Sequence, residues 1–247
     1  MKKKIILALA CRNNGSRLYG KPLQILDAKK KISVLTFIIK RIKKLKIVDD
    51  IVLAISNKKG NCIFEYIAKK EKIKFIYGDD KDVLKRLINC GKLTSAKNIL
   101  RITSESPYTY LNKFPEELKI HEKGNYDMSC LDNVIDGCNY EIIKLDALVK
   151  SHKEGSKQDK SEFCSRYIRN NKKKFKIRYI KPLKFLIRKD LRLTVDNPED
   201  LIICRKAYKY IDNYNINFKN IVKLISLKKN KELISKYLET GYSNLYL

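Results

Sequence analysis

Apolar positions in the first half of the chain form short runs that alternate with amphipathic segments. The runs predict buried strands, and the segments whose apolar residues recur every three or four positions predict helices. The expected strands cover residues 5–10, 51–55, 73–77 and 99–102, and the expected helices cover residues 34–45, 62–70 and 83–90. This alternation of strand and helix predicts an α/β fold with a mostly parallel sheet flanked by helices.

The pattern changes after about residue 125. Four further strands are expected at 126–130, 140–143, 175–180 and 191–194, with helices at 145–152, 161–170, 201–211, 218–227 and 231–238. No linker rich in Gly, Ser or Pro divides the chain, so we expect one domain, residues 1–247. Its expected parts are a core (3–125 and 190–212), an inserted lobe with a smaller mixed sheet (126–189) and a helical C-terminal extension (213–247).

The chain carries an excess of positive charge. It has 55 Lys and Arg residues against 27 Asp and Glu, a formal net charge of +28 over 247 residues. Such an excess favours nucleic acid, an anionic membrane or a polyphosphate as partner. The lysines are spread evenly and no motif of interleaved aromatic and basic residues occurs, so we expect no nucleic-acid partner. No apolar run approaches the roughly 18 residues of a membrane span, so we expect no such span.

The seven cysteines are scattered, and none forms a C-x-x-C pair. This spacing argues against a disulfide framework and against a zinc site. The apolar run 5–10 is short for a signal peptide and leads directly into a motif that follows a strand, so we interpret it as the first strand. We therefore expect a cytoplasmic protein with reduced thiols. The two histidines, His121 and His152, stand in polar helical segments and are expected at the surface.

The segment after the first strand carries the strongest chemical signal. It reads A-C-R-N-N-G-S-R-L-Y-G-K-P-L from residue 10 to residue 23 and holds three cations, Arg12, Arg17 and Lys21. Glycines let backbone N–H groups approach an anion, and the cations can neutralise a triphosphate. The order of residues is neither the P-loop pattern G-x-x-x-x-G-K-[ST] nor the dinucleotide pattern G-x-G-x-x-G. Because ligands bind at the carboxyl ends of parallel strands, we expect the site at this loop and at the loop after residue 102.

Five segments of the chain occur in an informative order. The first is R-x-x-x-S-R-L-x-G-K-P-L, which begins at Arg12. It is followed by I-V-L-A-I-S (51–56), Y-G-D-D-K-D-V-L-K-R (77–86), I-L-R-I-T-S-E-S-P (99–107) and L-R-L-T-V-D-N-P-E-D-L (191–201). Together they resemble the cytidylyltransferases over about residues 3–210. That family makes CMP-activated sugars and includes the 3-deoxy-manno-octulosonate enzymes, the acylneuraminate enzymes and the spore-coat polysaccharide biosynthesis relatives. The resemblance implies the nucleotide-diphosphosugar transferase fold.

The resemblance also implies a Mg²⁺-dependent nucleotidyltransferase. Such an enzyme transfers CMP from CTP to a sugar or sugar acid and releases pyrophosphate, here for surface polysaccharide or glycan biosynthesis. Mg²⁺ takes one or two carboxylates together with phosphate oxygens and water, and the family's two carboxylate positions fall on Glu105 and Asp196. With Arg12 and Lys21, these are the implied catalytic residues. The implied nucleotide-binding residues are Ala10, Arg12, Asn13, Asn14, Gly15, Ser16, Arg17, Lys21, Ser56 and Arg101, and the implied substrate-binding residues are Glu141 and Arg166.

The chain departs from the family in the loop after residue 102. The family has Asp where this chain has Glu105, and Gly and Cys where it has Ser104 and Ser106. The extra methylene of Glu moves the carboxylate farther from the backbone. Asp196 has a second interpretation, because D-N-P-E-D is also typical of a helix N-terminus. Arg101 either faces the nucleotide or pairs with an acid.

Three other functions remain open at this point. A related enzyme of the same fold would use GTP or another NTP with a sugar 1-phosphate. A catalytically inactive homologue would bind a nucleotide without turnover, as a result of the change at Glu105. A nucleic-acid-binding module would rest on the charge of +28 alone. The identity of the sugar and the oligomeric state, including a homodimer, also stay open.

Overall fold

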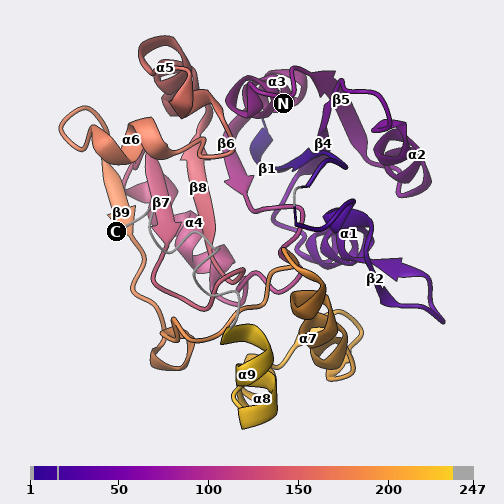
Figure 1. Cartoon of the computed structure of the whole chain (residues 1–247). Coiled ribbons are helices and arrows are strands. Elements are labelled where there is room, and N and C mark those ends of the chain that lie inside the picture. The colour runs from indigo at the N-terminus through magenta and orange to yellow at the C-terminus, as the bar shows by residue number, and fades with distance from the viewer. Residues whose placement is uncertain (1–2, 16, 236–247) are drawn as a thin grey trace.

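A seven-stranded mixed sheet forms the centre of the computed structural model, which describes residues 3–15 and 17–235 (Figure 1). The strand order is β5-β4-β1-β6-β8-β7-β9, and only β8 in this sheet runs antiparallel to its neighbours. The strands are β1 (Lys3–Cys11), β4 (Asp50–Ser56), β5 (Lys74–Gly78), β6 (Ala96–Arg101), β7 (Met128–Leu131), β8 (Tyr140–Lys144) and β9 (Ile177–Tyr179). The mostly parallel α/β sheet predicted from the sequence is confirmed.

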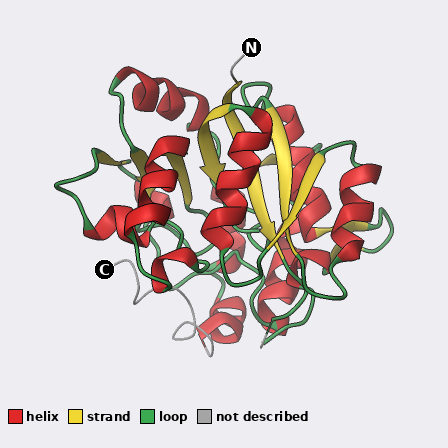
Figure 2. Cartoon of the chain, turned by 90° about the horizontal axis from the view of Figure 1, so that it is seen from above, coloured by secondary structure: helices red, strands yellow, loops and turns green. Residues whose placement is uncertain are grey.

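The central strand β1 is covered on both faces. Its residues 5–9 are fully buried, and alternate side chains enter two different apolar clusters, as the two-residue period of a strand requires. One cluster includes α1 (Val34–Lys44), α2 (Cys62–Lys70), α4 (Phe114–Lys123), α7 (Pro198–Tyr208) and α8 (Phe218–Ile225). The other includes α3 (Val83–Thr94), α5 (Leu145–Glu154) and α6 (Arg166–Asn170). Figure 2 shows the helices on both sides of the strands.

Shorter elements complete the described part of the chain. Two small antiparallel pairs are β2 (Ile25–Asp27) with β3 (Ile32–Ser33) and β10 (Ile211–Asp212) with β11 (Asn215–Ile216). The 3-10 turns are η1 (Lys21–Leu23), η2 (Gln158–Lys160) and η3 (Lys184–Leu186), and the last described helix is α9 (Lys228–Ser235). The end of the helix expected at 231–238 lies outside the described residues.

Several details differ from the expectations. The strands β7, β8 and β9, expected in an inserted lobe, join the main sheet because β8 pairs with β6. Residues 191–194 form no strand, and Arg192 makes a single bridge with Asp136 instead. The helix expected at 161–170 begins only at Arg166, and α4 was not predicted at all. In the first two cases a partner distant in sequence decided the local structure.

The prediction that His121 lies at the surface is wrong. Its side chain is buried on α4, with Nδ1 2.8 Å from Ser129 Oγ and Nε2 3.3 Å from Asn98 Oδ1. Burial lowers the pKa of His121 to about 4. His152 is only partly exposed, and its Nε2 lies 2.7 Å from Asp82 Oδ2. Both histidines therefore have structural partners.

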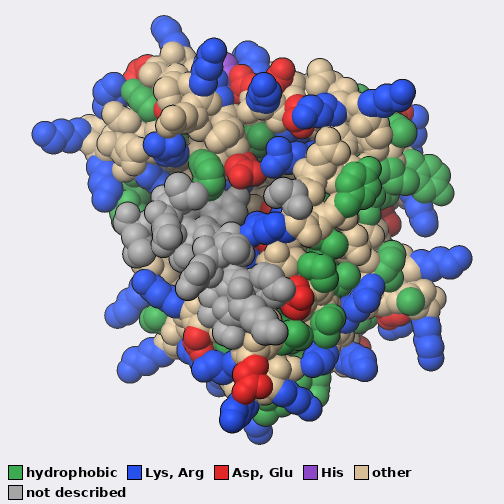
Figure 3. All heavy atoms as spheres, viewed as in Figure 1, with side chains coloured by type: hydrophobic (Ala, Val, Ile, Leu, Met, Phe, Trp, Pro, Cys, Tyr) green, Lys and Arg blue, Asp and Glu red, His purple; other side chains and the backbone are tan. Residues whose placement is uncertain are grey.

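On the face that Figure 3 shows, the positive charge is not concentrated in one patch of the described residues. Lys and Arg side chains lie at many places around the edge of that face. Within residues 3–15 and 17–235, none of the helices combines the length and the apolar character needed to cross a membrane.

Candidate active site

A pocket of about 330 Å³ opens at the carboxyl ends of β1 and β6. Two loops that follow these strands supply most of its walls, as the sequence analysis predicted. The lining residues are Ala8, Ala10, Arg12, Asn13, Asn14, Gly15, Arg17, Lys21, Pro22, Val83, Arg86, Leu87, Arg101, Ile102, Thr103, Ser104, Glu105, Glu162 and Asp196. Most of the predicted nucleotide-binding residues are therefore brought together. Ser16 lies outside the described residues.

The loop after β1 is held in shape by Asn13. Its backbone N–H donates to Asn61 Oδ1 (2.8 Å), its side-chain amide donates to Gly60 O (2.5 Å), and its carbonyl accepts from Gly20 N (2.8 Å). The last bond closes the loop at its base, and Gly20 makes the turn with a φ of +60°, which favours glycine. These bonds thus anchor the segment that carries Arg12, Arg17 and Lys21 at Asn13 and at Gly20.

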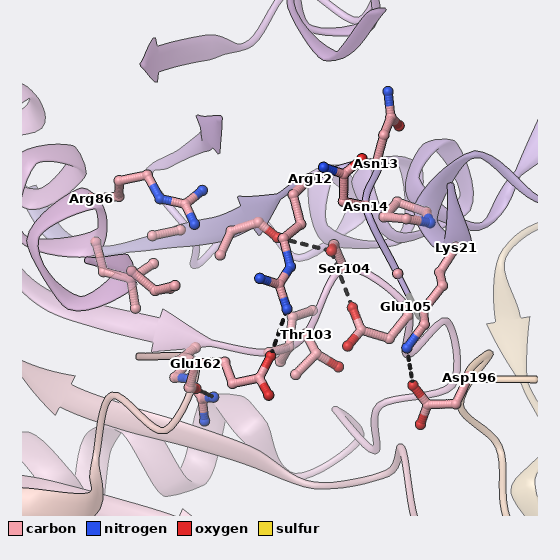
Figure 4. Close-up of a pocket in the computed structure, with 18 of the residues that line it drawn as sticks. Arg12, Asn13, Asn14, Lys21, Arg86, Thr103, Ser104, Glu105, Glu162 and Asp196 are labelled. Atoms are coloured by element: carbon pink, nitrogen blue, oxygen red, sulfur yellow. Dashed lines mark hydrogen bonds and ion pairs between the residues drawn. The ribbon is translucent and has the colours of Figure 1, made fainter. Parts of the chain in front are cut away.

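Glu105 and Asp196 meet at the pocket although they are far apart in sequence. The backbone N–H of Val195 donates to Glu105 O (2.9 Å), and Ser106 Oγ donates to Thr194 Oγ1 (3.2 Å). These bonds join the loop after β6 to the segment before α7. Figure 4 shows the carboxyl groups of Glu105 and Asp196 on either side of the Lys21 ammonium, which lies 2.5 Å from Asp196 Oδ1.

The two acids differ in their electrostatic environment. Burial raises the pKa of Glu105, and the neighbouring carboxylate of Asp196 raises it further, while Lys21 offsets part of this. Burial also acts to raise the pKa of Asp196, but Lys21, Arg17 and Arg192 outweigh it, so that this pKa lies below its ordinary value. Ser104 Oγ lies within hydrogen-bond distance of both Glu105 Oε2 (3.2 Å) and the carbonyl of residue 10 (2.9 Å).

The acid pair fits the protein's share of a magnesium site. Among the described residues, no group of three or more His, Cys, Asp and Glu side chains could hold a metal ion. Mg²⁺ does not need such a group, because one or two carboxylates suffice where phosphate oxygens and water complete the coordination. Two carboxylates that repel each other in one pocket gain from a shared cation.

Arg192 pairs with Asp196 from outside the pocket lining, and this role was not predicted from the sequence. Its side chain is 1% exposed, and its guanidinium contacts three carboxylates: Asp136 Oδ2 (2.9 Å), Asp196 Oδ2 (2.9 Å) and Asp200 Oδ1 (3.2 Å). Asp200 in turn accepts from the backbone N–H groups of Asp196 and Asn197, both at 3.0 Å, at the start of α7. Both interpretations of the D-N-P-E-D segment are therefore compatible with the structure: Asp196 faces the pocket, and the helix begins beside it. The position of Arg192 four residues before Asp196 is the sequence feature that could have predicted this pairing.

Arg101 combines the two alternatives left open for it. Its Nη1 donates to Glu141 Oε2 (2.8 Å) and its Nη2 to the carbonyl of Glu162 (2.7 Å), while the side chain also lines the pocket. Glu141 is 3% exposed and also binds Arg169 (2.6 Å). Burial opposes its ionisation, but Arg101 and Arg169 lower its pKa to about 2. Glu141 contacts Arg101 but is not itself one of the residues that line the pocket.

Two other predicted site residues are also outside the pocket lining. The Ser56 hydroxyl donates to Asp80 Oδ1 (2.7 Å). Arg166 donates to Gln158 Oε1 (3.1 Å) and lies 3.9 Å from Asp159 Oδ1. The structure gives both side chains partners away from the lining residues.

Arg86 and Glu162 line the pocket and were not predicted. Arg86 is 1% exposed, and its Nη1 donates to the carbonyl of Ala54 (2.5 Å) at the end of β4. Arg86 is the last residue of the D-V-L-K-R segment (82–86), and this motif could have marked it as a site residue. Glu162 approaches from the segment before α6, and its Oε2 lies 3.0 Å from Arg12 Nη2 (Figure 4). Nothing in the local sequence marks Glu162.

Comparison of sequences identifies relatives of the chain. No protein-family model matches it. A protein of Methanocaldococcus jannaschii, described as uncharacterized protein MJ1063, is 30% identical over 230 residues, which cover 93% of each chain. The chain belongs to the family of this archaeal protein. The spore coat polysaccharide biosynthesis protein SpsF of Bacillus subtilis is 22% identical over 207 residues, which cover 83% of this chain and 86% of SpsF.

Solved structures share the fold. A cytidylyltransferase from Leptospira borgpetersenii matches with a TM-score of 0.81 and 22% identity, over 94% of this chain and 96% of that one. A CMP:2-keto-3-deoxy-manno-octonic acid synthetase in complex with CTP matches with a TM-score of 0.61 and 13% identity, over 83% of this chain and 98% of that one. The chain thus has the cytidylyltransferase fold, and the predicted resemblance and fold class are confirmed.

Proposed function

We propose that the protein is a nucleotidyltransferase that moves CMP from CTP to a sugar or sugar acid. One observation carries the proposal: a single pocket sets the cationic loop with Arg12, Arg17 and Lys21 against the acids Glu105 and Asp196. This is a charge arrangement suited to a triphosphate and a divalent cation. The names of the relative SpsF and of the structural neighbours support CTP as donor and a surface polysaccharide as destination.

In the proposed reaction an oxygen of the acceptor attacks the α-phosphorus of CTP. The bond from that phosphorus to the bridging oxygen breaks in line with the attack, and pyrophosphate leaves with the electron pair. The protein contributes mainly positioning and charge neutralisation in such reactions. Arg12, Arg17 and Lys21 would bind the phosphate oxygens, with loop N–H groups beside them. Arg101, fixed by Glu141, would present its guanidinium to the same pocket.

Glu105 and Asp196 are the residues that would hold Mg²⁺. The ion would supply neutralisation of the negative charge that develops on the leaving pyrophosphate. Asp196 is the better-defined ligand of the two, because Arg192 fixes one of its oxygens. Glu105 has the longer side chain, and the hydroxyl of Ser104 donates to its carboxylate.

Activity should be tested with a panel of nucleoside triphosphates against candidate sugars, sugar acids and sugar 1-phosphates. Pyrophosphate release identifies the donor, and mass spectrometry of the product identifies the acceptor. Release with CTP and a sugar or sugar acid is the expected result. Release with another NTP and a sugar 1-phosphate would establish the alternative transferase instead. Binding of Mg²⁺ and CTP without release for every acceptor would favour an inactive homologue.

The phosphate-binding role of the loop has its own test. Lys21→Ala and Arg12→Ala should each raise the dissociation constant for CTP at least about tenfold, because a charge-assisted contact contributes roughly 1.5–3 kcal/mol. Lys74→Ala is a matched control. Lys74 begins β5 and pairs with Asp50, at the end of the sheet away from the pocket. Calorimetry with the three variants measures the affinities. Unchanged CTP affinity in both loop variants would remove the loop from the site.

A further inference from the structure

The two carboxylate oxygens of Asp196 are held by different cations. Oδ2 contacts Arg192 at 2.9 Å. Oδ1 contacts Lys21 at 2.5 Å and Arg17 at 3.2 Å. The Asp196 side chain is only 5% exposed. One oxygen faces the protein interior, and the other faces the pocket.

Arg192 is a permanent partner of Asp196. Its side chain is 1% exposed, and Asp136 and Asp200 hold it from two further directions. Moving it would leave a charged guanidinium and several carboxylates unpaired in the interior, which is strongly unfavourable. Arg192 therefore fixes the direction in which Asp196 Oδ1 points.

Lys21 can leave Asp196 at a smaller cost. Its side chain is 18% exposed and ends a flexible four-carbon stem. The end of the stem lies close to Gly15 in the loop. A Cβ added to Gly15 would be 3.3 Å from Lys21 Cε. The same ammonium faces the place where the loop would bind phosphate oxygens. A polyphosphate there would compete with Asp196 for it.

We propose that Lys21, with Arg17 on the same oxygen, is a built-in counter-ion of the acid pair, so that a divalent cation binds at Glu105 and Asp196 only when a polyphosphate has drawn these cations away from Asp196 Oδ1. Arg192 is the positioning residue that keeps Asp196 Oδ1 aimed at this site throughout. The idea rests on the proposed function in that the loop takes a polyphosphate and the acids take a metal. Coupling of this kind is reciprocal, so the metal also strengthens nucleotide binding.

Binding of Mn²⁺ to the nucleotide-free protein tests the proposal directly. Electron paramagnetic resonance of free Mn²⁺ gives the dissociation constant for the wild type, Lys21→Met and the control Lys74→Met. We expect weak binding in the wild type and in the control, and binding tighter by roughly tenfold or more in Lys21→Met. The gain should vanish in Lys21→Met/Asp196→Asn. Tight binding by the wild type, or a gain that survives Asp196→Asn, would overturn the proposal.

The role of Arg192 is tested in the Lys21→Met background. Adding Arg192→Lys keeps the charge but removes the guanidinium fork, and it should weaken Mn²⁺ binding roughly fivefold or more at a temperature well below the unfolding midpoint. A merely structural role would lower the midpoint and leave the Mn²⁺ affinity unchanged, which would contradict positioning. Neither arm uses a nucleotide. A failure to turn over CTP would therefore count against the proposed function and not against the role of Lys21.

Discussion

Replacing Glu162 by Gln should strengthen the binding of CTP. In the structure Glu162 Oε2 lies 3.0 Å from Arg12 Nη2, and both residues line the pocket. A triphosphate on the loop would have to draw Arg12 away from this partner and would also face the negative charge of Glu162. Glu162→Gln removes both obstacles. It leaves the backbone carbonyl of Glu162, which accepts from Arg101, in place.

The size of the effect follows from the exposure of the pair. The side chains of Arg12 and Glu162 are 45% and 50% exposed, so solvent screens their attraction. Exposed pairs of this kind are worth about 0.2–1 kcal/mol, and the upper value corresponds to about fivefold in affinity. The dissociation constant for CTP should therefore fall by up to about fivefold at low salt, and by less at higher ionic strength. Isothermal titration calorimetry at two salt concentrations measures both effects.

A double-mutant cycle separates the two contributions. If the gain comes from releasing Arg12, it should disappear when Glu162→Gln is made in the Arg12→Ala background. Glu154→Gln is the control, because Glu154 is a partly exposed acid that pairs with Lys174 away from the pocket. Unchanged or weaker CTP binding in Glu162→Gln at low salt would refute the reasoning.

The remaining predictions concern the metal loop and two buried groups. Glu105→Asp, which installs the residue typical of the family, should preserve or raise kcat, and a loss of turnover in the coupled pyrophosphate assay would contradict the reasoning that the shorter carboxylate can take over the role of Glu105. Glu141→Gln should lower the free energy of unfolding by about 3–5 kcal/mol in urea titrations, because Arg101 and Arg169 lose the buried carboxylate that they share; a change under about 1 kcal/mol would be inconsistent with this. His121 has a pKa of about 4 when folded against 6.5 in the unfolded chain, so the unfolded chain binds the proton first. Stability should then fall by up to about 3 kcal/mol as the pH drops from about 6.5 to about 4, and His121→Gln should lack this part of the pH dependence in thermal unfolding.

Local patterns in the sequence were sufficient for the parallel half of the fold and for one wall of the site. Strands β1, β4 and β6 were predicted because buried parallel strands are short apolar runs, and that property is local. The edge strand β5 is only partly buried, but it too is a short apolar run. The loop with Arg12, Arg17 and Lys21 was predicted because it follows such a run and concentrates cations and glycines. The convergence of Glu105 and Asp196 on one pocket was also expected, from the resemblance and from the rule that ligands bind at the carboxyl ends of parallel strands.

Only the tertiary structure decided which partners these groups have. Whether β7, β8 and β9 form a lobe or extend the main sheet depends on the pairing of β8 with β6, about 40 residues earlier in the chain. The burial of His121 against Asn98, the contact of Glu162 with Arg12 and the contact of Arg192 with Asp136 are likewise contacts between distant segments. The local sequence does not show whether a charged or polar side chain is solvated or buried. The free-energy cost of burying it is offset by a partner, and that partner often lies outside the local sequence.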